Sequence, residues 1–331
     1  MPSRSRQVML DTSAGPVRRT FRYAFYDWTA EMPKSKRVFT LTGVFIQGYA
    51  FYALWSRSLI WPIIWPSAPL LYAIVWVLYM LGYVVVNGML TSEFFRKTQL
   101  EADEIAAQQI QKTLQPDRIE QVPGYDLKTF YKPFRAVGGD YFDVIDLPGN
   151  RTLFALADVS GKGMPAALLS SNIQALVRSL AGSELDLVAM ASRINTHLSR
   201  YTPADRYATA VFIMLSRDSG ELSYVNCGHN PPMMCRSQLT TFLEATGLPL
   251  GLFKAAKYEA RVATIAPEDI LLVYTDGLTD SISGDSPEDR LRGALSADTE
   301  SSLSNLRALL DPMLTLDDVT ILLVKRTATA T

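Results

Sequence analysis

The stretch GGDYFDVIDLPGNRTLFALADVSGKG, residues 138–163, decides the fold class of this 331-residue chain. It contains two runs of apolar, aromatic and β-branched residues, 141–147 and 152–157, that predict two β-strands. An aspartate beside or close to glycine lies at each outer end, Asp140 and Asp158. Each aspartate alone predicts only a turn, because Asp and Gly are ordinary turn residues. The stretch therefore predicts a β-rich domain with acidic residues at the ends of its strands.

Similar runs on both sides of this stretch extend the prediction to a whole domain. Further strands are expected at 126–133, 207–216, 221–226, 270–274 and 319–325, and helices at 164–181, 186–198 and 302–310. Because the strands come in runs and the helices are grouped between them, the fold class is α+β. We expect two sheets packed face to face and covered by helices.

The apolar residues behind the mean hydropathy of +0.08 are concentrated near the amino terminus. Between Arg37 and Glu93 the only charged residue is Arg57. The uncharged runs on either side of it predict a membrane hairpin in residues 38–92, with helices at about 38–56 and 69–90. Trp and Pro residues between the helices suit a turn at the membrane interface. The alternative, a buried hairpin of a soluble protein, needs much shorter apolar runs.

Flanking charge predicts the orientation of the hairpin. Residues 1–37 carry eight basic and three acidic side chains, a charge of +5. By the positive-inside bias, this basic segment and everything after the hairpin lie in the cytoplasm. The chain is therefore expected to be a multi-pass protein of the inner (cytoplasmic) membrane. Residues 93–331 carry a net charge of −7, which argues against nucleic-acid binding.

Residues 93–122 are expected to link the hairpin to the β-rich domain, residues 123–327. The first part lacks Gly and Pro and predicts a helix that continues from the second membrane helix. Ala106, Ile110 and Leu114 form a narrow apolar stripe on it. The stripe can pack on the following domain or on a second copy of the chain, which would give a homodimer; the alternative is a solvated spacer helix.

The acidic clusters at the predicted strand ends carry the expected chemistry. They lie at 138–140, 158–163, 275–280 and 317–320. Carboxylates gathered at one edge repel one another unless cations neutralise them, and oxygen ligands select Mg²⁺ or Mn²⁺. Two cysteines and two histidines exclude a four-thiolate or histidine-rich zinc site. Two divalent ions activate water and neutralise phosphoryl oxygens, so the clusters predict hydrolysis of a phosphate ester.

Six motifs resemble the bacterial SpoIIE/RsbU-like branch of the metal-dependent (PPM, type 2C) protein phosphatases. They are VGGDYFDV (137–144), DVSGKGMPAALL (158–169), CGHNPPMM (227–234), GLPLGLF (247–253), VYTDGLTD (273–280) and DDVTILLV (317–324). They follow the order of the family over about residues 123–326. The segment EIAAQQIQKTLQP (104–116) resembles the regulatory helix that precedes the catalytic domain in this branch.

The resemblance implies a β-sandwich flanked by helices (αββα) that acts as a protein serine/threonine phosphatase in bacterial signal transduction. It implies two divalent cations, Mn²⁺ or Mg²⁺, and attack by metal-bound water without a phospho-enzyme. The metal-binding and catalytic residues that it implies are Asp140, Asp158, Asp276 and Asp317, with the backbone carbonyl of Val159; Asp280 is a weaker ligand, and Asp318 is the alternative to Asp317.

The resemblance also implies the substrate, a phosphorylated anti-sigma-factor antagonist of the STAS type. The competing hypothesis is a non-catalytic membrane sensor or scaffold whose phosphatase-like domain binds a partner. The phosphate-binding arginine of eukaryotic members has no clear counterpart, although Lys132 and Arg135 lie nearby. His229 invites the role of a catalytic acid, but we expect a structural role, because its motif is not a metal motif. Asp280 stands where glutamate is common in this branch.

Overall fold

The structure is a computed structural model that describes residues 45–49, 52–53, 69–114, 121–182, 185–203, 205–236, 239–283, 286–311 and 313–327. The chain divides into two compact units, Met1–Ala102 and Asp103–Thr331.

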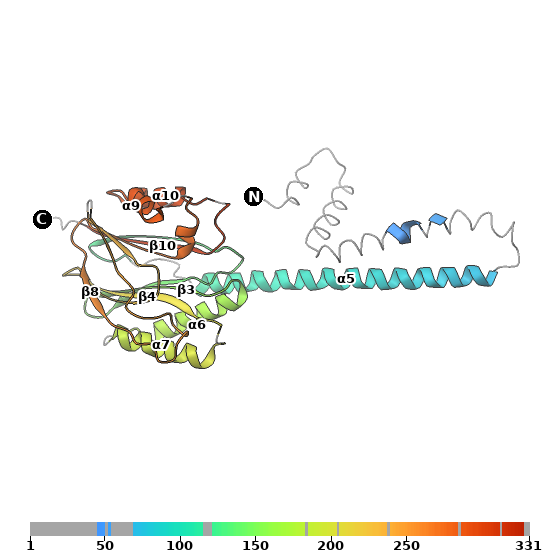
Figure 1. The fold of residues 1–331 in the computed structure, drawn as a ribbon, viewed down its shortest axis with the longest axis horizontal. Helices are drawn as coiled ribbons and strands as arrows, with labels where there is room; N and C mark the ends of the chain where they lie inside the picture. The colour runs from blue at the N-terminus through green and yellow to red at the C-terminus, as the bar shows by residue number, and fades with distance from the viewer. Residues whose placement is uncertain are drawn as a thin grey trace. The chain divides into compact units, whose positions relative to one another are not determined.

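A single helix, α5 (Pro69–Leu114), begins in the first unit and ends in the second (Figure 1). It contains 46 residues, about 69 Å of helix at 1.5 Å per residue. It joins the predicted second membrane helix to the predicted linker helix without a break, as the lack of Gly and Pro after residue 93 indicates. Of the predicted first membrane helix, residues 45–49 and 52–53 are helical, and the remainder lies outside the described residues, as does the turn after it.

One helical segment in the described part of the chain, Trp76–Leu114, is long and apolar enough to cross a membrane. Its mean hydropathy reaches 1.3. The sequence predicts two such spans. The described residues therefore provide a candidate for one of the two predicted membrane helices, the second.

The second unit contains two five-stranded antiparallel sheets. Sheet A has the order β1 (Tyr125–Lys132), β10 (Val319–Arg326), β9 (Ile270–Tyr274), β6 (Met233–Arg236) and β7 (Leu239–Phe242). Sheet B has the order β2 (Tyr141–Leu147), β3 (Arg151–Val159), β4 (Ala208–Ser216), β5 (Glu221–Cys227) and β8 (Arg261–Thr264). The predicted strands 141–147 and 270–274 have the same bounds in the structure.

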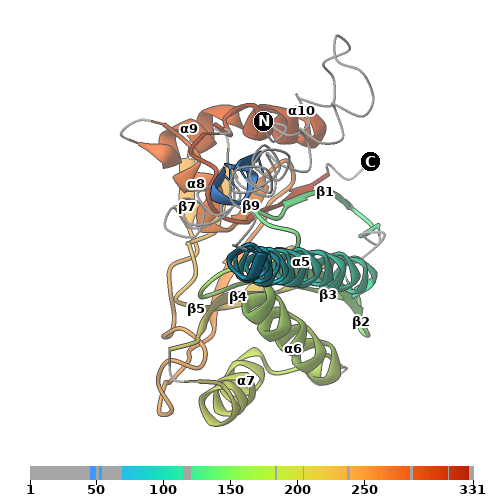
Figure 2. The ribbon, with the colours of Figure 1, turned by 90° about the vertical axis from the view of Figure 1, so that its right-hand side faces the viewer.

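Helices cover the outer face of each sheet, so the domain has four layers (Figure 2). Sheet B is covered by α6 (Met164–Leu180) and α7 (Leu187–Tyr201), and sheet A by α8 (Asp276–Asp280), α9 (Pro287–Ala294) and α10 (Thr299–Ala308). This is the expected α+β sandwich flanked by helices, and the predicted fold class is confirmed.

The sequence of β3 shows how the layers are built. Leu153, Ala155 and Ala157 face the helices α6 and α7, whereas Phe154 and Leu156 face sheet A. Side chains alternate across a strand, so a strand that is covered on both faces must be apolar throughout. The run LFALA meets this requirement.

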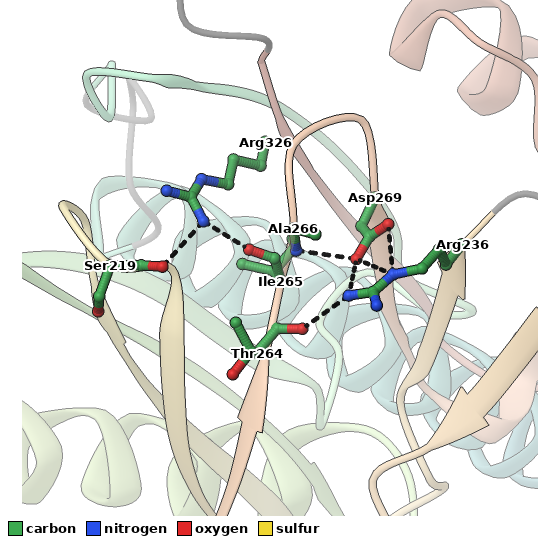
Figure 3. Close-up of polar contacts among 7 residues, drawn as sticks. All are labelled: Ser219, Arg236, Thr264, Ile265, Ala266, Asp269 and Arg326. Carbon is green, nitrogen blue, oxygen red and sulfur yellow. Dashed lines mark hydrogen bonds and ion pairs between the residues drawn. The ribbon is translucent and has the colours of Figure 1, made fainter.

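A polar network ties the two sheets together near the beginning of β9 (Figure 3). The buried carboxylate of Asp269 accepts hydrogen bonds from the Arg236 guanidinium at 2.8–3.1 Å. The Arg326 guanidinium donates to the carbonyls of Ser219 and Ile265, each at 2.9 Å. These contacts hold one end of β9, and its other end leads into the acidic cluster.

Candidate metal centre

The structure places the four predicted metal ligands at the same end of the sandwich. Asp140 directly precedes β2 and Asp158 lies near the end of β3, and these two strands pair antiparallel in sheet B. Asp276 follows β9 as the first residue of α8, and Asp317 lies two residues before β10 in sheet A. Each sheet therefore contributes two acidic residues from two neighbouring strands.

Two threonines hold the carboxylate of Asp140. Its Oδ2 accepts hydrogen bonds from Thr275 Oγ1 at 2.9 Å and from Thr320 Oγ1 at 2.6 Å. Asp140 is 2% exposed. Burial raises its pKa well above the ordinary value, the charge of Asp158 adds to the rise, and the hydrogen bond from Thr320 opposes it. Thr320 lies in β10 of sheet A and Thr275 directly follows β9, whereas Asp140 directly precedes β2 of sheet B, so the carboxylate also links the two sheets.

The charges of other acidic residues shift the pKa of Asp158. Burial is the largest cause that raises its pKa to about 7, and the charges of Asp276, Asp317 and Asp318 follow. A hydrogen bond with Asp140 opposes the rise. Asp158 therefore lies at the electrostatic centre of the cluster, where a cation would relieve the largest repulsion.

Asp276 stands where β9 turns into the short helix α8. Burial is the largest cause that raises the pKa of Asp276, and the charges of Asp317 and Asp280 raise it further. The next residue, Gly277, meets the backbone just before β10: a Cβ built there would lie 2.0 Å from the carbonyl oxygen of Asp318. Glycine is needed here because no side chain fits between the two chain segments.

The neighbours Asp317 and Asp318 have different surroundings. Both carboxylate oxygens of Asp318 accept backbone N–H groups, from Phe134 at 2.7 Å and from Gly139 at 2.5 Å. Asp317 Oδ1 accepts the N–H of Asp318 at 2.9 Å, and its Oδ2 lies 2.6 Å from Lys162 Nζ. A lysine side chain can turn away from a carboxylate, whereas the two backbone groups at Asp318 are fixed in place.

The donor chemistry of this cluster fits a hard divalent cation. In the described part of the chain, no three His, Cys, Asp or Glu side chains form a ready ligand set. The reason is visible in the contacts: threonines hold Asp140, and Lys162 pairs with Asp317. The donors are all oxygens, and their negative charges raise the pKa of one another, which is the environment that Mg²⁺ or Mn²⁺ stabilises.

The loop after β3 brings basic residues to the acidic cluster. Lys162 Nζ pairs with Asp317, donates to the Leu316 carbonyl and lies 5.1 Å from the centre of the Phe134 ring. Gly163 adopts a φ of +75° as the N-cap of α6, and a Cβ built there would lie 3.5 Å from Arg135 Nη1. Arg135 therefore lies beside this loop. Lys132, the other basic residue that the sequence left without a role, pairs with Val319 in sheet A.

The predicted backbone ligand also lies beside this loop. A Cβ built at Gly139, next to Asp140, would lie 3.2 Å from the Val159 carbonyl oxygen. The carbonyl that the sequence assigns to the metals thus lies beside the first acid of the cluster.

Sequence reasoning missed several residues that shape the site. Thr275 and Thr320 are within the quoted motifs, but threonine in a strand indicates only β-structure. The fully buried Asp143 binds the Arg178 guanidinium at 2.7 and 3.0 Å and so fastens α6 to β2. The motif GGDYFD contains this second aspartate, but its partner is 35 residues away in the chain.

His229 has the structural role that we expected. Its Nδ1 lies 2.8 Å from Thr209 Oγ1, and its Nε2 lies 3.1 Å from the Tyr274 carbonyl oxygen. Burial lowers its pKa to about 4, and the hydrogen bond to Tyr274 opposes that fall. A neutral, fully bonded ring between the sheets does not act as a catalytic acid.

Comparison with known proteins agrees with this architecture. The phosphoserine phosphatase RsbU of Bacillus subtilis is 28% identical over 179 residues, which cover 54% of this chain and 53% of RsbU. The chain thus spans about half the length of that relative. The structure of the RsbU and RsbW domains of Rv1364c from Mycobacterium tuberculosis matches with a TM-score of 0.55 and 27% identity, covering 63% of this chain and 62% of that one. The SiaA-PP2C domain of Pseudomonas aeruginosa matches with a TM-score of 0.60 and 19% identity, covering 70% of this chain and 99% of that domain.

The family model of Stage II sporulation protein E (SpoIIE) matches residues 148–327. The match includes Asp158, Asp276 and Asp317, and Asp140 lies just before it. It covers more than half of the chain, and the sandwich observed here contains every matched residue that the structure describes. The chain belongs to the SpoIIE family.

Proposed function

We propose that the protein is a membrane-anchored, metal-dependent serine/threonine phosphatase of the cytoplasm. The observation that carries this proposal is the cluster of carboxylates from both sheets, which raise the pKa of one another at one end of the sandwich. Such a cluster is unfavourable in itself, and a phosphatase that holds two cations gives it a function.

The ligands of two Mn²⁺ or Mg²⁺ ions are Asp140, Asp158, Asp276 and Asp317, with the Val159 carbonyl and, more weakly, Asp280. When bound, such ions supply an activated water near neutral pH and neutralise phosphoryl oxygens. Asp158, at the electrostatic centre of the cluster, would hold both ions. Asp318 stays with its two backbone N–H groups and shapes the loop that carries Asp140.

The chain's own residues position the substrate and the ligands. Thr275 and Thr320 orient the carboxylate of Asp140. Lys162, which pairs with Asp317 here, would be free to hold a phosphoryl oxygen beside the site once Asp317 holds a cation. Arg135 lies close to the same loop and adds positive charge for the phosphate.

The substrate in this proposal is a phosphoserine or phosphothreonine of a cytoplasmic regulatory protein. RsbU, a phosphoserine phosphatase, is the curated relative described above. The exposed apolar side chains of Phe134 and Leu316 lie next to the cluster and suit contact with a protein surface. By family resemblance, the substrate is an anti-sigma-factor antagonist of the STAS type.

The membrane hairpin and α5 attach the domain to the inner membrane and set its activity. The side chain of Gln111, near the end of α5, exchanges two hydrogen bonds with the backbone of Gly138 at 2.7 and 3.1 Å. Gly138 lies two residues before Asp140, so a shift of Gln111 with α5 would move the backbone next to this proposed metal ligand. The stripe of Ala106, Ile110 and Leu114 is exposed on α5 and suits a second copy of this helix in a homodimer.

The test is phosphate release from a phosphoserine peptide by the full chain in detergent micelles. We expect release that requires Mn²⁺ and stops in EDTA. Asp158→Asn and Asp276→Asn should each reduce it to the EDTA level, whereas the control Asp205→Asn, at a 79% exposed side chain, should not. Turnover unchanged by the first two substitutions would refute the proposal. Failure to bind Mn²⁺ at millimolar concentration would favour the non-catalytic sensor or scaffold.

A further inference from the structure

One imidazole ring bridges the two sheets through partners that neighbour the acidic cluster. His229, 3% exposed, lies in the loop after β5. Its Nδ1 lies 2.8 Å from the hydroxyl of Thr209 in β4 of sheet B. Its Nε2 lies 3.1 Å from the carbonyl of Tyr274 in β9 of sheet A. The ring therefore fixes the separation of the sheets at this point.

Each partner of the ring is a close neighbour of a proposed metal ligand. Thr209 is paired with Asp158 in the register of β4 and β3, so both side chains point to the same face of sheet B. Tyr274 ends β9, two residues before Asp276. The His229 side chain thus connects Thr209, the residue paired with Asp158, to Tyr274 at the end of the strand that precedes Asp276.

The hydrogen-bond partners assign the proton on the ring. A carbonyl oxygen can only accept, so Nε2 carries the hydrogen and donates it to Tyr274. Nδ1 then presents a lone pair, which accepts the hydroxyl hydrogen of Thr209. Both ring nitrogens are satisfied in this neutral form, and the low pKa of His229 agrees with it.

The loop that carries the ring is itself fixed. The fully buried side chain of Asn226 accepts the N–H of His229 at 2.8 Å and donates to its carbonyl at 3.1 Å. Gly228 has a φ of +68°, and a Cβ built there would lie 2.8 Å from Pro249. The ring therefore acts as a rigid spacer, because neither its backbone nor its nitrogens are free to adjust.

We propose that His229 is a positioning residue that sets the distance between Asp158 and Asp276 for cation binding. The inference rests on the proposed function, because it assigns His229 a role toward the cations of that site. His229 contacts neither the cations nor the substrate and acts through Thr209 and Tyr274. A purely structural histidine would contribute to folding alone; a positioning histidine also contributes to metal affinity.

The experiment measures Mn²⁺ affinity and stability separately. The full chain in detergent micelles is titrated with Mn²⁺ by isothermal titration calorimetry, and its unfolding by urea is measured in EDTA. His229→Ala removes both hydrogen bonds, Thr209→Val removes one with little change of volume, and His229→Gln keeps an amide donor for the Tyr274 carbonyl.

The matched control is Asp269→Asn at the opposite end of β9. Asp269 is also a buried polar residue, and it binds Arg236 and accepts the N–H of Ala266 at 2.8 Å (Figure 3). It directly precedes β9 and Tyr274 ends the strand, a separation of about 16 Å for five residues. The substitution disturbs the same strand far from the cluster.

We expect His229→Ala and Thr209→Val to weaken Mn²⁺ binding about tenfold or more, as loss of an outer-shell partner does at metal sites. His229→Gln should recover part of the loss, and Asp269→Asn should lower stability with an unchanged dissociation constant. A dissociation constant within twofold of wild type for Thr209→Val and His229→Ala would overturn the inference. Equal weakening by Asp269→Asn would also overturn it. Absence of Mn²⁺ binding by the wild type would instead refute the proposed function.

Discussion

Replacing Asp158 by asparagine should make the metal-free protein more stable. The substitution keeps the shape of the side chain and removes a negative charge from the centre of four other carboxylates. Burial and the charges of Asp276, Asp317 and Asp318 all disfavour the ionised form of Asp158 in the folded chain. The unfolded chain lacks this penalty, so the charge lowers the free energy of unfolding.

The pKa of Asp158 sets the size and the pH range of the effect. The pKa rises from 3.8 in the unfolded chain to about 7 in the folded chain. At 1.36 kcal/mol per unit, the cost of ionised Asp158 in the folded state is about 4 kcal/mol above pH 7. Between pH 4 and 7 Asp158 binds more protons in the folded state than in the unfolded state, so its contribution to wild-type stability falls as the pH rises. Asp158→Asn lacks this loss.

The assay is urea unfolding of the full chain in EDTA, followed by far-UV circular dichroism from pH 4 to 8. Asp158→Asn should exceed the wild type by up to about 4 kcal/mol at pH 8, and the gap should close toward pH 4. Millimolar Mn²⁺ should stabilise the wild type and leave the variant unchanged. A variant less stable than the wild type at pH 8, or a difference in the free energy of unfolding that is independent of pH, would contradict the raised pKa of Asp158.

The remaining predictions concern three other parts of the site. Asp318→Ala should lower the free energy of unfolding by about 2–4 kcal/mol, because one buried and one partly buried N–H group lose their acceptor. Asp317→Ala should weaken Mn²⁺ binding with a smaller loss of stability. The reverse pattern in denaturation and calorimetry would contradict these roles. Lys162→Met should tighten Mn²⁺ binding in calorimetry, since the ammonium group no longer competes for Asp317; weaker binding would show that the lysine does not compete. The folded pKa of His229 is low, about 4, so the unfolded chain takes up a proton on this residue first as the pH falls below 6.5. His229 therefore contributes a loss of up to about 3 kcal/mol of stability by pH 4, separate from the opposite contribution of Asp158. His229→Gln should lack that part of the acid destabilisation in urea denaturation from pH 4 to 7, and an unchanged pH slope would contradict the assigned pKa.

Strands with clear local boundaries could be predicted from the sequence. The strand 141–147 lies between Asp140 and Pro148, and 270–274 lies between Asp269 and the TDG turn, so turn residues mark both ends. The predicted strand 152–157 is too short, because β3 continues to Val159 by pairing with β4. A neighbouring strand decides that extension, and no local signal predicts it.

The shortest elements could not be predicted from the sequence. Strands β6, β7 and β8 have four residues each, and α8 has five, too few to show a hydrophobic period. β6 forms because Met233 and Cys235 pair with Leu272 and Ile270 of β9, far along the chain. The helix α9 was also missed, because its sequence PEDRLRGA contains only two buried residues.

At the site, the sequence predicts the acidic residues and not their surroundings. Asp140 was recognisable because glycine and aspartate form a motif, but its threonine partners are 135 and 180 residues away. The choice between Asp317 and Asp318 depends on which carboxylate meets backbone N–H groups, which only the folded chain decides. The position of His229 between the sheets has the same origin, since its partners lie in different strands.

The most direct test of the account is to locate manganese in crystals of the protein grown with Mn²⁺, by anomalous diffraction. We expect two peaks about 3.5–4 Å apart. Asp158 should contact both, and Asp140, Asp276 and Asp317 should complete the ligand set. Peaks bound to Asp318 in place of Asp317, or no peak beside Asp158 in crystals soaked at saturating Mn²⁺, would contradict the central claim that this acidic cluster is a two-metal phosphatase site.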